Sequence, residues 1–231
     1  MLNSTIVNIR NLNYYYETKR SKIQVLFDIN LEIKTGEFVF LTGPSGSGKS
    51  TLLSLIGGLR SVQEGSIEVF GYELKKMNQR QGKKVRRLIG YIFQASNLVN
   101  CLTVQQNLQM SLKLNPIKYS RKEMIELSNT TLEMVGLDHR INYYPDDLSG
   151  GEKQRAAIAC ALVNKPKLIL ADEPTAALDG KSAQNIINLM HHLVKQEETS
   201  ILMITHDNRF LNIADHIIHI QDGKSFFKSQ I

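Results

Sequence analysis

Residues 43–50 read Gly43-Pro44-Ser45-Gly46-Ser47-Gly48-Lys49-Ser50, which fits the pattern GxxxxGK[ST] of a phosphate-binding loop. The wholly apolar run 38–41 precedes this loop, and apolar residues recur at helical spacing after it, at Leu52, Leu55, Ile56 and Leu59. Glycines let backbone N–H groups turn toward the phosphates, and the start of a helix adds its positive end. We therefore expect Lys49 to reach the β- and γ-phosphate oxygens and Ser50 to ligate Mg²⁺.

Two further apolar runs end in polar residues. The run 168–171 leads into Asp172 and Glu173, and the run 201–204 leads into Thr205 and His206. Short, wholly apolar runs are typical of strands covered on both faces, as in a parallel sheet between helices. Ligands bind beyond the carboxyl ends of such strands. The sequence therefore predicts an α/β fold with a mainly parallel sheet core and its polar residues gathered at one edge.

The carboxylates of Asp172 and Glu173 have predicted roles in ATP hydrolysis. Asp172 is expected to hold the magnesium ion, and Glu173 is the candidate general base, because attack on the γ-phosphate requires an oriented, partly deprotonated water. The sequence Asp-Glu-Pro also begins many helices and turns, so the pair gains its meaning from the preceding phosphate-binding loop. Together the two motifs still leave kinases, GTPases and recombinases open.

The chain is predicted to form one domain, residues 1–231, that contains a subdomain. The stretch from about 97 to 163 has helical patterning and few strand signals, so it is interpreted as a mostly helical insertion. The core then comprises residues 1–96 and 164–231. No internal repeat, low-complexity tract or Pro/Gly/Ser-rich linker suggests a second domain.

Composition excludes a membrane-spanning chain. The content of 42% hydrophobic and 22% charged residues lies in the ordinary globular range. Apolar runs such as 168–171 and 201–204 are far shorter than the roughly 18 residues of a spanning helix. Residues 1–10 lack a basic segment followed by an apolar run, so no signal peptide is predicted. The chain is expected to stay in the cytoplasm.

Charge and cysteine usage give weaker signals. The net charge of +6 could suit an anionic ligand or membrane leaflet, although a solvated surface is the preferred interpretation. Cys101 and Cys160 lack CxxC spacing and neighbouring histidines, so both are expected to be free thiols without a disulfide or zinc site. The loosely clustered basic residues are Lys75, Lys76, Lys83, Lys84, Arg86 and Arg87.

The stretch Leu148-Ser149-Gly150-Gly151-Glu152 supports two interpretations that can both hold. Ser149 and Glu152 have the spacing of a capping box, which would start the following alanine-rich helix for structural reasons alone. A capped helix start preceded by two glycines is also a second anion site that could press against a γ-phosphate. Because the chain already has one phosphate-binding loop, the phosphate that faces this site is expected to belong to another copy.

With this motif in place, the sequence resembles the nucleotide-binding subunits of ABC transporters over nearly its whole length. Six elements occur in the family's order: residues 43–51, Gln94 within 91–94, 148–152, Asp172 with Glu173, 177–179 and His206. The resemblance implies a P-loop ATPase that also has an antiparallel β portion near the N-terminus. It implies ATP and Mg²⁺ as cofactors.

The resemblance also assigns further site residues. It implies that Thr51 and Gly151 contribute to nucleotide binding, that Gln94 contacts Mg²⁺ and senses the membrane subunit, and that Asp179 bridges two cassettes. His206 would hold the γ-phosphate. Within Asn13-Tyr14-Tyr15-Tyr16, spacing before the loop favours Tyr16 as the aromatic that stacks on adenine, although Tyr14 would share its side of an extended segment.

Within the family, the sequence is most similar to the MacB/LolD-like cassettes and to the DevA-type subunits of DevBCA exporters. This similarity rests on residues 24–31, 41–50, 57–65 and 172–179. It implies export through a separate permease with a periplasmic adaptor. Glu152 stands where the family often has Gln, and Cys160 where it often has Arg, which puts partner contacts in doubt and leaves the catalytic groups intact.

The sequence thus predicts an ATP hydrolase whose two copies close head to tail, each ATP lying between Lys49 of one copy and Ser149 of the other. It would work at the cytoplasmic face of the inner membrane as a peripheral subunit, without nucleic acid. Two alternatives stay open: a regulatory cassette that signals across the membrane without moving cargo, and a soluble ABC ATPase. The latter would usually show a second cassette or a long coiled-coil insertion, which this sequence lacks.

Overall fold

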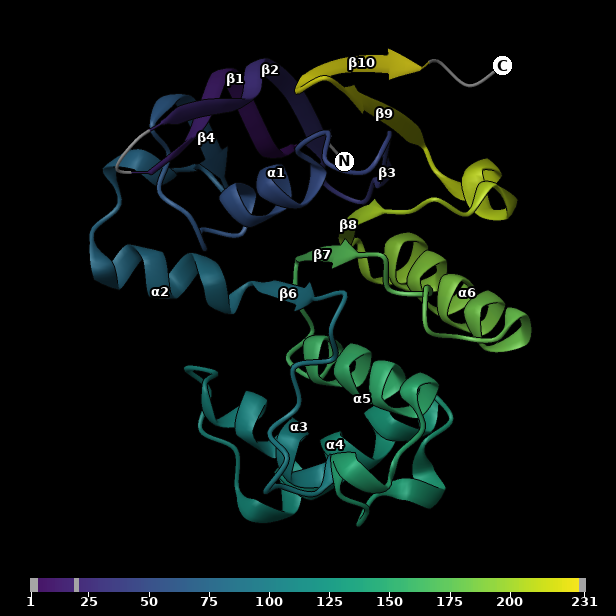
Figure 1. Cartoon of the computed structure of the whole chain (residues 1–231). Helices are drawn as coiled ribbons and strands as arrows, with labels where there is room; N and C mark the ends of the chain where they lie inside the picture. Colours follow the sequence, from purple (N-terminus) through teal and green to yellow (C-terminus); the bar gives the residue numbers. More distant parts are fainter. Residues whose placement is uncertain (1–3, 19–20, 229–231) are drawn as a thin grey trace.

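A computed structural model describes residues 4–18 and 21–228 (Figure 1). An antiparallel four-stranded sheet has the order β2-β1-β4-β5. Its strands are β1 (Thr5–Glu17), β2 (Lys22–Lys34), β4 (Glu64–Val69) and β5 (Tyr72–Glu73). In β2, buried Ile29, Leu31 and Ile33 alternate with exposed Asn30 and Glu32, so one face of the sheet packs inward and the other meets solvent. The antiparallel N-terminal portion implied by the family resemblance is therefore confirmed.

The second sheet contains six strands in the order β10-β9-β3-β8-β7-β6. All are parallel except β10, which pairs antiparallel with β9. The predicted strands at 38–41, 168–171 and 201–204 are β3, β7 and β8, and they are neighbours in this sheet. Its members are β3 (Phe38–Thr42), β6 (Ile89–Ile92), β7 (Leu168–Asp172), β8 (Ser200–Ile204), β9 (His216–Gln221) and β10 (Lys224–Lys228).

Apolar side chains cover both faces of the parallel sheet, as the sequence predicts. In β3, Phe38 and Phe40 join a core cluster formed with the helices between residues 104 and 197, whereas Val39 and Leu41 join a cluster formed with α1 (Lys49–Ile56) and the antiparallel sheet. Successive residues of a strand point to opposite faces, which explains this division. Helix α1 ends at Ile56, so Leu59, expected on its buried face, lies beyond the helix and is 49% exposed.

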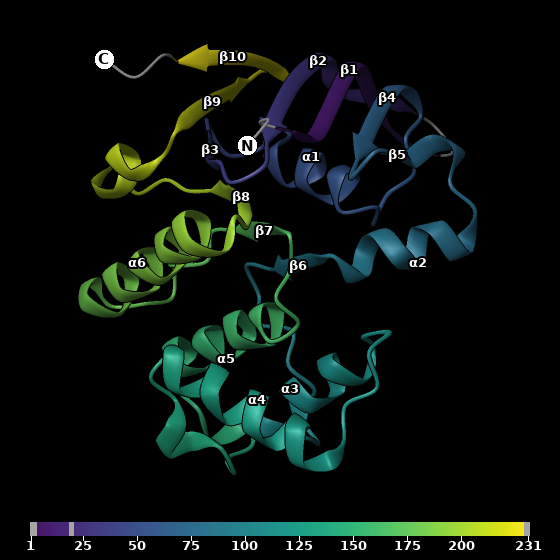
Figure 2. The same cartoon turned by 180° about the vertical axis from the view of Figure 1, so that it is seen from behind.

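Three helices lie together beyond the edge strand β6 (Figures 1 and 2). They are α3 (Val104–Lys113), α4 (Arg121–Met134) and α5 (Gly150–Leu162), and each begins with a capping box. Residues 97–163 contain these helices and no strand. Helix α6 (Gly180–Glu197) packs against the parallel sheet. The remaining helical segments are η1 (Leu74–Lys76), α2 (Gln79–Arg87), η2 (Asp138–Arg140), η3 (Pro145–Asp147) and η4 (Asn208–Ile213). No described helix has the length and apolar character to cross a membrane.

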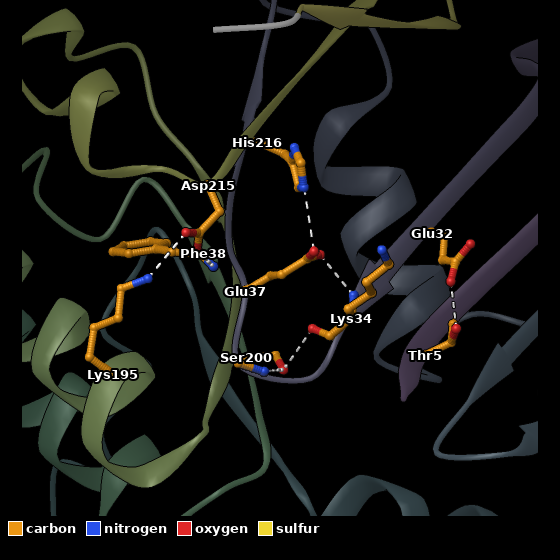
Figure 3. A network of polar contacts seen from close by, with 10 residues as sticks. Thr5, Glu32, Lys34, Glu37, Phe38, Lys195, Ser200, Asp215 and His216 are labelled. Carbon is orange, nitrogen blue, oxygen red and sulfur yellow. Dashed lines mark hydrogen bonds and ion pairs between the residues drawn. The ribbon is translucent and has the colours of Figure 1, made fainter. Parts of the chain in front are cut away.

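Polar contacts fix the turn that joins the two sheets (Figure 3). In this turn, the Glu37 carboxylate accepts a hydrogen bond from the Lys34 N–H at 2.8 Å and lies 3.4 Å from His216 Nε2. Ser200 Oγ accepts from the Gly36 N–H at 3.0 Å and donates to the Lys34 carbonyl at 3.3 Å. Contacts from β8 and β9 therefore hold the chain at the point where it leaves β2 and enters β3.

A second contact in the same network secures the start of β3. Asp215 Oδ2 accepts a hydrogen bond from the backbone N–H of buried Phe38 at 2.8 Å, and its Oδ1 lies 3.1 Å from Lys195 Nζ on α6 (Figure 3). The first bond satisfies a buried donor, whereas the second joins two partly exposed side chains. The two bonds of this carboxylate should therefore contribute unequally to stability.

We predict that Asp215→Ala lowers the free energy of unfolding by about 1–3 kcal/mol, because the Phe38 N–H then loses its acceptor. Lys195→Met removes only the ion pair to the same carboxylate and should cost less than about 1 kcal/mol. Urea unfolding of the two variants measures the difference. Equal losses of stability would show that the bond from the Phe38 N–H to Asp215 contributes no more to stability than the ion pair with Lys195.

Candidate functional site

Three glycines of the loop 43–48, Gly43, Gly46 and Gly48, have a positive φ. At Gly43, φ is 136°, and a Cβ there would lie 1.9 Å from the carbonyl oxygen of Ile220. Gly48 has φ 101° and directly precedes Lys49, the first residue of α1. L-residues with a side chain rarely adopt such angles, so a larger residue would distort the loop. The predicted strand, loop and helix start are therefore all present in the expected order.

The side chain of Lys49 points back into this loop. Its ammonium donates hydrogen bonds to the carbonyl oxygens of Gly43 at 2.8 Å and Pro44 at 2.7 Å, and the residue is 5% exposed. Burial lowers the pKa of Lys49, and the nearby carboxylates of Glu173 and Asp172 oppose that shift. A buried cation beside two carboxylates is suited to a ligand that brings oxygen anions into the loop.

Tyr16 lies next to the phosphate-binding helix. Its hydroxyl is 3.0 Å from Thr51 Oγ1 on α1, and the residue is 37% exposed. Tyr14 packs edge-on against the Tyr16 ring at 5.4 Å but is only 7% exposed. Both tyrosines share one side, as expected, and only Tyr16 offers surface for stacking. Arg60, which was not selected as a site residue from the sequence, has its Cζ 5.0 Å from the centroid of the Tyr16 ring.

The carboxyl ends of β7 and β8 bring the predicted catalytic residues together. Asp172 is the last residue of β7, and the next residue, Glu173, has φ 48°. This angle is uncommon for a residue with a side chain, and such strain often occurs at functional sites. The Glu173 N–H donates to the Ile204 carbonyl at 3.1 Å, and its Oε1 lies 3.3 Å from His206 Nε2.

Gln94 occupies the same edge of the sheet. In the pairing of β6 with β7, Ile92 lies opposite Ala171, so β6 ends at the edge of the sheet where β7 ends in Asp172. Gln94 follows β6 by two residues and is exposed. The edge therefore collects Gln94, Asp172, Glu173 and His206 near the loop that contains Lys49. Their individual catalytic and metal-binding roles stay predictions.

The second predicted anion site is in another part of the chain. Ser149 caps α5, which lies with α3 and α4 and away from α1 (Figures 1 and 2). A Cβ on Gly151 would lie 3.3 Å from the Ala177 carbonyl oxygen, so this glycine packs close to the loop that leads to Asp179. Asp179 in turn caps α6 through the N–H groups of Lys181 and Ser182, both at 3.0 Å.

One chain thus contains two separate candidate half-sites. Lys49 and the sheet-edge residues form the first, and Ser149, Gly151 and Asp179 form the second. Among the described residues, the Ser149 side chain hydrogen-bonds only to Glu152 of its own capping box. The exposed Ser149 and Gly150 leave room at this helix start, because a Cβ on Gly150 would meet nothing within 4 Å.

The structure also reveals Arg140, which no sequence motif indicated. Its Nε lies 2.8 Å from Glu152 Oε1, twelve positions away along the chain. A loop and a short 3₁₀ segment separate the two residues, so helical spacing could not indicate the pair. The contact places a cation against Glu152, the capping-box partner of Ser149.

Comparisons with known proteins agree with this geometry. The sequence profile of the family described as ABC transporter matches residues 26–176. A relative named as the putative hemin import ATP-binding protein HrtA of Staphylococcus haemolyticus is 41% identical over 223 residues, which are 94% of this chain and 98% of that protein. The lipoprotein-releasing system ATP-binding protein LolD of Pseudomonas fluorescens is 41% identical over 226 residues, 96% of this chain and 98% of that protein.

A solved structure gives the same result for the fold. The dimeric ATP-binding cassette MJ0796, in a post-hydrolysis state bound to ADP and Pi, matches with a TM-score of 0.91 and 35% identity, covering 97% of this chain and 100% of that one. The α/β architecture with a parallel sheet core is therefore confirmed. The chain belongs to the ABC transporter family and is an ATP-hydrolysing cassette of the MacB/LolD type.

Proposed function

We propose that two copies of this chain close head to tail around ATP, and that closure drives a separate membrane permease of the exporter type. The observation that carries this proposal is the separation of the two half-sites within one chain. Lys49 and Ser149 lie on α1 and at the start of α5, in different parts of the fold (Figure 1). In the proposed dimer, each ATP lies between Lys49 of one copy and Ser149 of its partner.

In the first half-site, residues 43–51 hold the triphosphate. Backbone N–H groups of the loop surround the β-phosphate, and Lys49 exchanges its two carbonyl acceptors for phosphate oxygens. Tyr16 supplies the stacking surface for adenine. The hydroxyl of Ser50, the carboxylate of Asp172 and the amide oxygen of Gln94 are oxygen donors of the type that Mg²⁺ takes and would hold the ion here. Mg²⁺ bound there would neutralise charge on the phosphates.

Glu173 performs the proton chemistry in this proposal. Its carboxylate orients a water molecule toward the γ-phosphorus and receives the proton as the new P–O bond forms and the bond to ADP breaks. His206 Nε2 lies 3.3 Å from Glu173 Oε1, and in this proposal His206 holds both that carboxylate and the γ-phosphate. Phosphate and ADP are then the products.

Coupling to transport follows from differential affinity. ATP contacts both copies only in the closed dimer, so it binds that state more tightly than the open one and shifts the population toward closure. Hydrolysis removes the γ-phosphate that joins Lys49 to Ser149, and the pair reopens. Asp179, the N-cap of α6 and a member of the second half-site, would contact the opposite copy.

The permease is proposed to dock in a groove of about 580 Å³ between α2 with β6 and α3 with α5. Phe93, the neighbour of Gln94, lines this groove, so a docked segment would lie next to the nucleotide site.

The two walls of the groove differ in character. One wall has the cations Lys83, Arg86 and Arg87, none of which forms an ion pair within the described part of the chain. The facing wall has apolar residues including Met110 and Leu114, which are 40% and 64% exposed.

This groove matches a cytoplasmic segment of the permease that presents carboxylates on one side and apolar side chains on the other. Such docking would place the chain as a peripheral subunit at the cytoplasmic face of the inner membrane. We propose export of the DevBCA/MacB type, with a periplasmic adaptor joined through the permease. One relative is named for hemin import and another for lipoprotein release, so similar cassettes serve different cargoes. We therefore propose that other polypeptides select the cargo.

We predict that Glu173→Gln binds ATP but hydrolyses it about 10²–10⁴ times more slowly, because the general base is lost while the nucleotide contacts stay. ATP should then trap a stable dimer. Size-exclusion chromatography with ATP measures this outcome. A variant that elutes only as a monomer at ATP concentrations well above its nucleotide affinity would contradict the proposed closure.

The groove yields a separate prediction. Arg86→Glu combined with Arg87→Glu should prevent co-purification with the membrane subunit from detergent extracts, because like charges then face the docking segment. Lys122→Glu reverses one charge on exposed α4, away from the groove, and should co-purify as wild type does. Unchanged co-purification of the groove variant, despite normal melting, would refute docking there. Binding of the wild-type chain to protein-free anionic vesicles, lost in the groove variant, would assign these cations to lipid instead.

A further inference from the structure

The Glu152 carboxylate is held at both oxygens. Its Oε2 accepts hydrogen bonds from the Ser149 N–H at 2.9 Å and from the Ser149 hydroxyl at 2.8 Å. Its Oε1 accepts from Arg140 Nε at 2.8 Å. The Glu152 side chain is only 14% exposed. A capping box requires only the two bonds to backbone N–H groups, so the hydroxyl bond and the arginine contact are additional to the cap.

The hydroxyl bond has a consequence for phosphate binding. A serine hydroxyl has a single proton to donate. While Ser149 donates it to Glu152, the Ser149 oxygen can only accept, and it presents lone pairs to any approaching phosphate. The proposed contact between Ser149 and the γ-phosphate of the partner's ATP therefore requires the hydroxyl to leave Glu152 and turn outward.

The charge of Glu152 also opposes phosphate binding at Ser149. The hydrogen bonds from Ser149 and the guanidinium of Arg140 lower the pKa of Glu152 to about 2, so the side chain is a carboxylate at neutral pH. A carboxylate one hydrogen bond away from Ser149 repels an incoming phosphate. An amide at this position would hold the same cap without the charge.

Arg140 is arranged to offset that repulsion. It is the last residue of η2, its Cζ lies 4.5 Å from the centre of the Tyr143 ring, and its side chain is 31% exposed. The contacts with Tyr143 and Glu152 fix the position of the guanidinium. The equivalent box at the start of α4, Ser120 with Glu123, has no arginine on its carboxylate within the described residues. The arginine is therefore not a general requirement of such caps.

We propose that Glu152 competes with the γ-phosphate of the partner's ATP for the Ser149 hydroxyl proton, and that Arg140 is a positioning residue that limits this competition by neutralising Glu152. The pair would set the ATP concentration at which two copies close. This inference rests on the proposed two-copy site and adds to it a residue, Arg140, that touches neither nucleotide nor metal.

The test measures the ATP concentration that gives half-maximal dimer, by light scattering, with every variant built on Glu173→Gln so that ATP persists. Glu152→Gln should lower this concentration about 3- to 10-fold, the effect of exchanging one hydrogen bond for another. Arg140→Met should raise it by a similar factor, because the carboxylate is then uncompensated. Combining the two changes should restore the value of Glu152→Gln alone, since Arg140 then has no charge to neutralise.

The double variant separates positioning from a structural role. If Arg140 only fastens η2 to α5, the combined variant would dimerise as poorly as Arg140→Met, and the inference would be wrong. An unchanged midpoint for Glu152→Gln would also overturn it. Lys122→Met, which breaks an exposed ion pair on α4, is the matched control and should leave the midpoint unchanged. Thermal melting of each variant identifies loss of the fold.

Failure of the inference differs from failure of the proposed function. If ATP produces no dimer in the Glu173→Gln background itself, the two-copy site is refuted, and the Arg140 inference with it. If ATP produces the dimer but the midpoints of the Glu152 and Arg140 variants do not move as stated, only the inference is refuted.

Discussion

The side-by-side pairing of β3, β8 and β7 is the constraint on which the rest of this structure depends. Parallel pairing brings the carboxyl ends of these strands to one edge, so the phosphate-binding loop, Glu173 and His206 become neighbours although about 160 residues separate the first from the last. Each strand is buried on both faces, by α1 and the antiparallel sheet on one side and by helices such as α6 on the other. A shift of one residue in this register would turn every side chain to the opposite face. The core therefore fixes the catalytic edge.

The second half of the proposed site lies on helix starts beyond that sheet. Ser149 begins α5 and Asp179 begins α6, and Gly151 packs against the loop before Asp179, so the two helix starts form one surface. Capping satisfies the backbone N–H groups of these helices and also places polar side chains at the positive end of a helix, where anions bind. One set of residues thus stabilises the fold and prepares a surface that a second copy can use. We propose that the Ser149–Glu152 box affects both the stability of the fold and dimerisation, and that Arg140 modulates its effect on dimerisation.

Much of this could be predicted from the sequence because the decisive signals are local. The loop 43–50 and the runs 168–171 and 201–204 each combine a strand with the polar residues that follow it, and all three lie where they were expected. Leu59 was misplaced because periodicity alone does not show where a helix ends, and Gly57 ends α1 first. Arg60 and Arg140 could not be predicted, because their contacts with Tyr16 and Glu152 join segments that only the folded chain brings together. The groove between α2 and α3 could not be predicted either, because its walls come from segments that only the folded chain brings together. From the sequence alone, its cations were interpreted as a solvated surface cluster.

In the proposed mechanism, an active site requires two copies of the chain. The most direct measurement mixes Ser149→Asp chains with Lys49→Ala chains and records ATP hydrolysis. Aspartate caps a helix about as well as serine, so Ser149→Asp should melt like wild type while its charge repels the γ-phosphate of the partner's ATP. In the mixed dimer, one composite site is intact and the other has both defects. The account predicts that each variant alone is inactive and that partial activity returns on mixing. Normal hydrolysis by Ser149→Asp alone, or no activity in a mixture shown to contain ATP-bound heterodimers, would contradict it.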